Sequence, residues 1–109
     1  MKWLETITIR CAGSREKREV MDLLQKIRMP EGETGLVAVE VYQSALVESD
    51  ASVHIHGCSE GFGHGKSSLG LRLTQALSDF GLISHSLWLP EGTVPLKKLR
   101  ANHEEQSVI

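Results

Sequence analysis

The sequence predicts an α+β fold in which a four-stranded antiparallel sheet carries two helices on one face. Four segments alternate apolar and polar residues, as strands with one buried face do. Two other segments repeat apolar residues at helical spacing. Their order is strand, helix, strand, strand, helix, strand. The polar stretch 48–51 is short enough to join the second and third strands as an antiparallel hairpin.

The spacing of apolar residues changes between the first predicted strand and the first predicted helix. Residues 3–11 place most of their apolar side chains at odd positions, which gives a strand with one apolar face. We expect Ser14 to cap the helix that follows, because a serine side chain can accept a hydrogen bond from the free amides of the first turn. The helix should end before Pro30. Its apolar residues are Val20, Met21, Leu23, Leu24 and Ile27.

The second half of the chain repeats the pattern. Residues 36–46 and 52–57 are predicted as strands, and residues 82–89 as the last strand. Ser67 or Ser68 is expected to cap the second helix, and Gly81 to end it in the left-handed conformation. The apolar stripe of this helix is Leu69, Leu73, Ala76, Leu77 and Phe80. We therefore divide the chain into a folded unit, residues 1–92, and a polar C-terminal tail, residues 93–109.

This element order is that of the ferredoxin-like βαββαβ unit, whose sheet has helices on one face only. The other face is then uncovered. We expect it to carry apolar side chains such as Tyr42, Leu46 and Trp88, whose exposure to water is unfavourable. A second subunit or a ligand should therefore cover it.

Composition limits the class of protein. A chain of 109 residues fits one domain, and a formal net charge of −2 with a pI near 6.2 gives no electrostatic footprint for nucleic acid. No apolar run approaches the length of a membrane span. Two cysteines, Cys11 and Cys58, and an N-terminus without a signal pattern lead us to expect a cytoplasmic protein.

This layout, with the segments Ser67–Leu73 and Phe80–Trp88, resembles the dimeric α+β barrel superfamily, and within it the antibiotic-biosynthesis-monooxygenase-like branch. The resemblance covers about residues 3–90 and rests on topology rather than on a diagnostic motif. It implies a homodimer whose sheets pack face to face, a pocket between sheet and helices, and oxygenation of aromatic molecules without a bound cofactor. The Asn, Trp and His of haem-degrading members are not reproduced, since the only asparagine is Asn102, in the tail.

The glycine-rich segment 57–68 is similar to a phosphate-binding P-loop but is incomplete. The motif needs a glycine five positions before the Gly65–Lys66 pair, and Glu60 stands there. An anion-binding site formed by Gly65, Lys66, Ser67 and Ser68 is still a hypothesis, because they precede a helix N-terminus. The alternative is a loop whose serine only caps the helix, with Phe62 as part of a lid.

Three histidines are the candidate catalytic residues: His54, His56 and His85. His54, His56 and Cys58 share one face of the third strand, but the last strand does not adjoin that strand in this topology, so no metal site is predicted. The candidate pocket walls are Trp88, Phe62 and Tyr42. Glu5 and Glu40 would be acid–base groups if they were buried together, but we expect them to be solvated. We expect Cys11 to be a buried thiol.

Two functions remain open, as does the question of whether the chain is an enzyme. The first is a dimeric protein that binds a small apolar or aromatic molecule and acts as a monooxygenase without a cofactor. The second is a non-enzymatic regulatory or assembly module that dimerises through its open sheet face. A ligand-sized cavity between sheet and helices, reached by a histidine, would favour the first; a filled space would favour the second.

Overall fold

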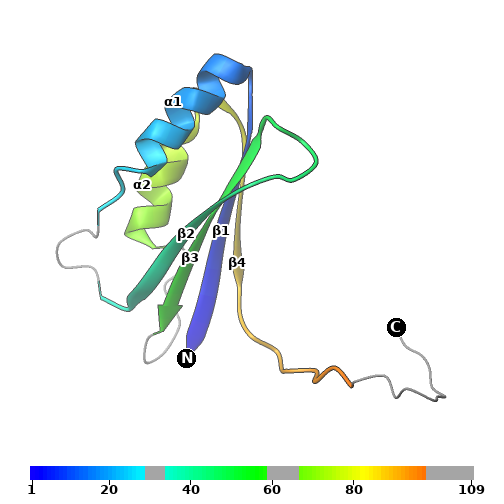
Figure 1. Cartoon of the computed structure of the whole chain (residues 1–109). Coiled ribbons are helices and arrows are strands. Elements are labelled where there is room, and N and C mark those ends of the chain that lie inside the picture. The colour runs from blue at the N-terminus through cyan, green and yellow to red at the C-terminus, as the bar shows by residue number, and fades with distance from the viewer. Residues whose placement is uncertain (29–33, 59–66, 98–109) are drawn as a thin grey trace, which may run out of the picture.

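The computed structural model describes residues 1–28, 34–58 and 67–97. Its elements are β1 (Lys2–Cys11), α1 (Ser14–Leu24), β2 (Leu36–Gln43), β3 (Asp50–Cys58), α2 (Ser68–Leu77) and β4 (Gly81–Trp88). The strands form one antiparallel sheet in the order β2-β3-β1-β4, and both helices lie on the same side of it (Figure 1). The predicted α+β fold is confirmed, and the topology is consistent with a ferredoxin-like unit.

The register of the sheet divides its side chains into two sets. β1 is an inner strand that pairs with β3 on one side and β4 on the other. Ile7 lies opposite Val53, and both are fully buried. Since successive side chains point to opposite faces, the odd-numbered residues of β1 and β3 face the helices. The buried core consists of Ile7, Ile9, Cys11, Val20, Leu24, Ala51, Val53, Ile55, Leu69, Leu73 and Leu77.

The helix ends confirm one predicted cap and correct two. The Ser67 hydroxyl accepts a hydrogen bond of 2.9 Å from the Gly70 amide and caps α2. At α1, however, Ser14 is already the first helical residue, and no side chain caps the helix. Gly81 is not a left-handed cap but the first residue of β4. A Cβ atom there would lie 2.0 Å from the backbone oxygen of Arg10, so close strand pairing explains this glycine.

β2 is shorter than predicted. It ends at Gln43, and residues 44–49 form the hairpin connection to β3. The Ser44 hydroxyl accepts hydrogen bonds from the amides of Leu46 and Val47, which turns the chain away from the sheet. Leu46 is therefore not on the sheet face but in the loop, where it is 94% exposed.

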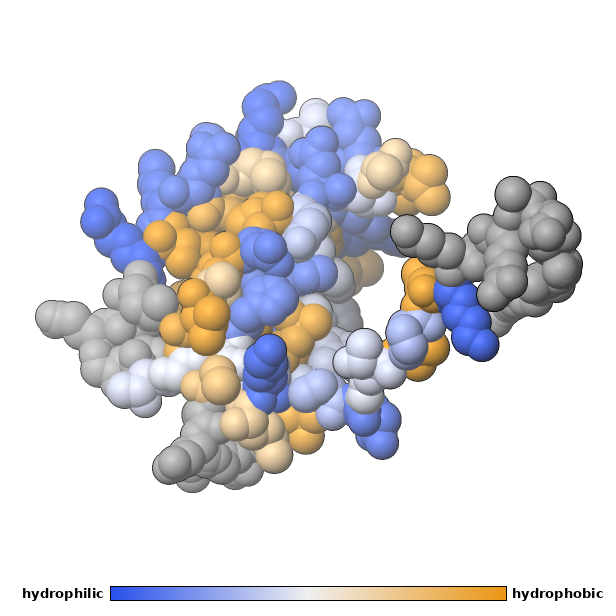
Figure 2. All heavy atoms as spheres, turned by 60° about the horizontal axis from the view of Figure 1, so that its bottom comes forward, coloured by the Kyte–Doolittle hydropathy of each residue, from blue (hydrophilic) through white to orange (hydrophobic). Residues whose placement is uncertain are grey.

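Residues 89–97 have no regular secondary structure and extend away from the sheet (Figure 1). In the view of Figure 2, hydrophobic residues form several patches that hydrophilic residues separate. Neither helix in the described ranges has the length and apolar character that crossing a membrane requires.

The packing of α2 gives a test of the core. Leu77 is fully buried, whereas Leu71 on the same helix is half exposed. Leu77→Ala should lower the free energy of unfolding by about 2–5 kcal/mol, because it leaves a cavity. Leu71→Ala should change it by less than about 1 kcal/mol. Urea denaturation followed by circular dichroism measures both, and equal losses would contradict the orientation of α2.

Candidate functional site

The side of the sheet away from the helices is named the open face here. No described helix covers it (Figure 1). The strand register assigns to it the even-numbered residues of β1, β3 and β4 and those of β2 from Ala38 on. The irregularity between Leu36 and Ala38 leaves Leu36 opposite Gly57, on the helix side. The open-face residues are Lys2, Leu4, Thr6, Thr8 and Arg10 of β1, Ala38, Glu40 and Tyr42 of β2, Asp50, Ser52, His54, His56 and Cys58 of β3, and Leu82, Ser84, Ser86 and Trp88 of β4.

The open face is more polar than predicted. Tyr42 and Trp88 lie on it and are about half exposed, as expected. Seven of the other positions, however, carry hydroxyl or imidazole groups: Thr6, Thr8, Ser52, His54, His56, Ser84 and Ser86. The charged residues stand at the ends of the strands or on the edge strand β2, so the centre of the face holds no carboxylate, ammonium or guanidinium group. The sequence already contains this signal, since threonine, serine and histidine occupy the central even positions of β1, β3 and β4.

The β2 side of the open face carries a hydrogen-bonded cluster around Glu40. Its Oε1 lies 2.7 Å from His56 Nε2 and accepts a hydrogen bond of 3.1 Å from the Tyr42 hydroxyl. The centroids of the Tyr42 and His54 rings lie 4.5 Å apart. The hydrogen bond with His56 lowers the pKa of Glu40 most, and the hydrogen bond from Tyr42 lowers it further. The same hydrogen bond to Glu40 raises the pKa of Tyr42. Both partners of the Glu40–His56 pair remain solvated, so water screens the pair.

The helix side of the sheet holds a buried polar group that was expected to be solvated. Glu5 is fully buried. Its Oε1 accepts hydrogen bonds from the Ser67 hydroxyl at 2.6 Å and the Ser67 amide at 3.2 Å, and its Oε2 lies 2.5 Å from His85 Nε2. Glu5 occupies an odd position in β1, together with Ile7 and Ile9, and this parity was the signal in the sequence that it faces the helices.

The Glu5 carboxylate joins the N-terminus of α2 to the sheet. The free amides and the dipole of a helix N-terminus favour a negative charge, and Glu5 supplies it from within the chain. Gly70 makes this approach possible, because a Cβ atom at that position would lie 1.9 Å from Glu5 Oε2. The amide and hydroxyl of Ser67, predicted to bind an external anion, are thus directed at an internal one.

The structure does not bring the three candidate histidines together. His54 and His56 lie on the open face, whereas His85 lies on the helix side beside Glu5. Within residues 1–28, 34–58 and 67–97, no three His, Cys, Asp or Glu side chains gather closely enough to hold a metal ion. Phe62, Gly65 and Lys66 lie outside the described residues, and Ser68 is the first residue of α2.

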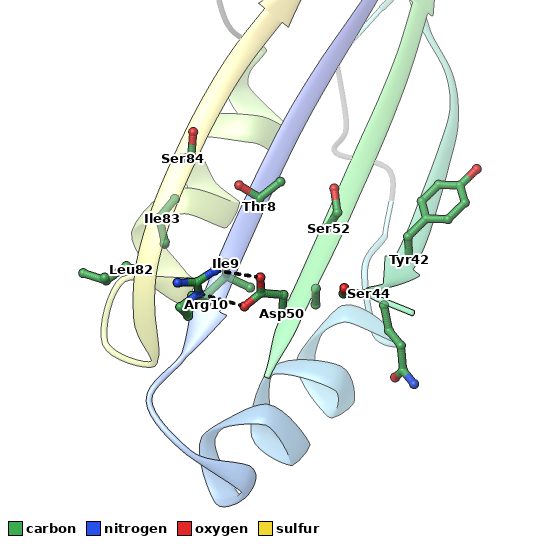
Figure 3. Close-up of a pocket in the computed structure, with 12 residues that line it drawn as sticks. Thr8, Ile9, Arg10, Tyr42, Ser44, Asp50, Ser52, Leu82, Ile83 and Ser84 are labelled. Atoms are coloured by element: carbon green, nitrogen blue, oxygen red, sulfur yellow. Dashed lines mark hydrogen bonds and ion pairs between the residues drawn. The ribbon is translucent and has the colours of Figure 1, made fainter. Parts of the chain in front are cut away.

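The described residues enclose hollows on both sides of the sheet. Between sheet and helices lies a hollow of about 210 Å³. Its lining is entirely aliphatic and contains Leu24, Ile27, Val39, Val41 and Leu69. A larger hollow of about 460 Å³ lies on the open face at the end nearest the β2–β3 hairpin (Figure 3). A third, of about 360 Å³, lies at the opposite end, where His56 and Trp3 contribute to its lining.

No family model matches this sequence, and no curated protein matches it.

The buried carboxylate gives a stability test with a matched control. Glu5→Gln replaces an acceptor oxygen with an amide NH₂ group that faces the Ser67 donors, and we expect it to lower the free energy of unfolding by about 1–3 kcal/mol. The control is Glu40→Gln, which changes a solvated carboxylate that also pairs with a histidine. Glu40→Gln should change the free energy of unfolding, measured by urea denaturation, very little. A larger effect of the control would contradict the assigned role of Glu5.

The two cysteines give a test of the two sheet faces. Cys11 is buried on the helix side, and burial raises its thiol pKa because the thiolate is disfavoured there. Cys58 is exposed. At pH 8, Cys58 should therefore react with an aromatic disulfide reagent much faster than Cys11, which should become reactive on unfolding. The single-cysteine variants Cys11→Ala and Cys58→Ser separate the two rates, and comparable rates would refute this assignment.

Proposed function

We propose that the chain is an assembly module that forms a homodimer by packing two open faces together. The observation that carries this proposal is the distribution of charge on the face. Charged groups stand at its rim, and its centre holds hydroxyl groups, imidazoles and aliphatic side chains. Depletion of charge at the centre, with a polar rim and exposed Tyr and Trp side chains, is typical of protein interfaces.

The chemistry of the face also suits pairing with itself. A twofold dimer brings the same patch of both copies into contact, so the patch must be complementary to itself. Hydroxyl and neutral imidazole groups both donate and accept hydrogen bonds, which allows Thr6 or His54 to pair with its own copy. A face carrying one sign of charge at its centre would repel its copy instead.

The oxygenase hypothesis receives less support from the described residues. It needs a ligand-sized cavity between the sheet and the helices, with a polar group that reaches it. The hollow found there is small and aliphatic, and His85, the candidate histidine on that side, lies against Glu5. We therefore favour the assembly module over the enzyme.

Thr6→Arg tests the proposed dimer. Thr6 lies on the inner strand β1 near the middle of the open face. The substitution would bring two arginines together in a twofold interface, and we expect it to raise the dimer dissociation constant at least about fiftyfold. Sedimentation equilibrium of the wild type and the variant measures this change.

Leu71→Arg is the matched control for this experiment, because it adds the same charge on the exposed side of α2. It should leave the dissociation constant unchanged. A wild-type chain that sediments as a monomer at all accessible concentrations would contradict the proposal. So would a dimer that only Leu71→Arg disrupts.

A further inference from the structure

The hollow of about 460 Å³ on the open face has the size of a small-molecule site, for which volumes of about 300–1,000 Å³ are usual. It spans all four strands at the end of the sheet nearest the β2–β3 hairpin (Figure 3). No residue of α1 or α2 lines it, so it is separate from the aliphatic hollow between the sheet and the helices.

One row of hydroxyl groups crosses this hollow. Tyr42 pairs with Ser52, Ser52 with Thr8, and Thr8 with Ser84, so each strand contributes one hydroxyl at the same level of the sheet. Side chains opposite each other on neighbouring strands stand about 4.5–5.5 Å apart. Neighbouring hydroxyls of a sugar or cyclitol lie closer together, so such a molecule placed along the row can reach two or three of these side chains.

Ser52 is the strongest indication that the row binds something. Its Oγ is shielded from solvent and has no hydrogen-bond partner among the described residues. A shielded hydroxyl without a partner is unfavourable by an amount comparable to a lost hydrogen bond. Figure 3 shows the Ser52 side chain standing off β3 between those of Thr8 and Tyr42. Rotation of the Ser52 side chain toward the hollow would let a ligand hydroxyl supply the missing partner.

The electrostatics of the hollow favour an uncharged ligand. Its two charged side chains, Arg10 and Asp50, pair with each other through two contacts, Nε to Oδ1 at 3.1 Å and an Nη to Oδ2 at 3.3 Å (Figure 3). The remaining polar side chains are hydroxyls and the amide of Gln43. The lining therefore has no net charge that would favour an anion or a cation over a neutral molecule.

We propose that this hollow binds a neutral polyhydroxylated molecule of monosaccharide size, with Thr8 and Ser52 as the central contacts. The proposal rests on the proposed dimer, because the hollow is open in a single chain and the second open face would close it. The ligand would then lie at the subunit interface and stabilise the dimer by mass action.

Isothermal titration calorimetry with D-glucose and with myo-inositol tests the site, and gluconate and glucosamine serve as charged analogues. A neutral probe should bind saturably at up to about 10 mM, where a millimolar site approaches saturation. The charged analogues should bind at least about tenfold more weakly. The double variant Thr8→Val/Ser52→Ala should weaken binding by about tenfold or more. Ser86→Ala, on the same face but outside the hollow, should have less than about a twofold effect.

Sedimentation of the same samples separates this inference from the proposed function. A dimer that binds neither neutral probe, or binds them equally well after the double substitution, overturns the ligand site and leaves the assembly module standing. A monomer that binds no probe overturns both. A neutral probe that binds and also lowers the dimer dissociation constant supports both.

Discussion

The register of β1 against its two neighbours is the constraint on which the rest of this structure depends. β1 pairs with β3 and β4 over most of its length, so its alternation fixes the face of every side chain on three strands. A slip of one residue would exchange the core side chains with the threonines of the open face. The burial of Ile7, Val53 and Ile55 holds the register, since a slip would expose all three. The hydroxyl row and the charged rim are therefore consequences of core packing.

The Glu5 network adds a second constraint, on the position of α2. A buried carboxylate is tolerated only when its oxygens have partners, and Glu5 has Ser67 and His85. Because Ser67 is the N-cap residue of α2 and His85 belongs to β4, one side chain ties three elements together. Gly70 sets how closely the helix approaches. This polar contact orients α2 more specifically than its aliphatic stripe alone, which could slide along the sheet.

Much of the fold was predictable from local patterns. The period-2 strands, the two helices and the Ser67 cap all depend on residues close in sequence, and all are present. Of the predicted stripe of α2, Leu69, Leu73 and Leu77 are buried, whereas Ala76 is exposed and Phe80 lies beyond the end of the helix. The misplaced cap at Gly81 and the burial of Glu5 depend instead on contacts between distant segments. The end of β2 follows from the local hydrogen bonds of Ser44. Gly81 pairs with Cys11, and Glu5 accepts a hydrogen bond from Ser67. These residues lie far apart in the sequence, so patterns of neighbouring residues do not predict the contacts. The candidate histidines were grouped by residue type alone, and the sheet places His54 and His56 on one face and His85 on the other.

The polarity of the open face bears on how tightly two copies would associate. Obligate dimers bury faces that resemble a protein core, whereas the centre of this face holds Thr6, Ser52 and His54. Hydroxyl groups lose hydrogen bonds to water when they enter an interface and regain a similar number across it, so the net gain is modest. Such an interface suits reversible association rather than a permanent dimer. The Ser52 hydroxyl has no hydrogen-bond partner among the described residues, and a ligand that binds it preferentially in the dimer would shift the equilibrium toward the dimer. The same polar face that makes assembly weak would then make it responsive to a ligand.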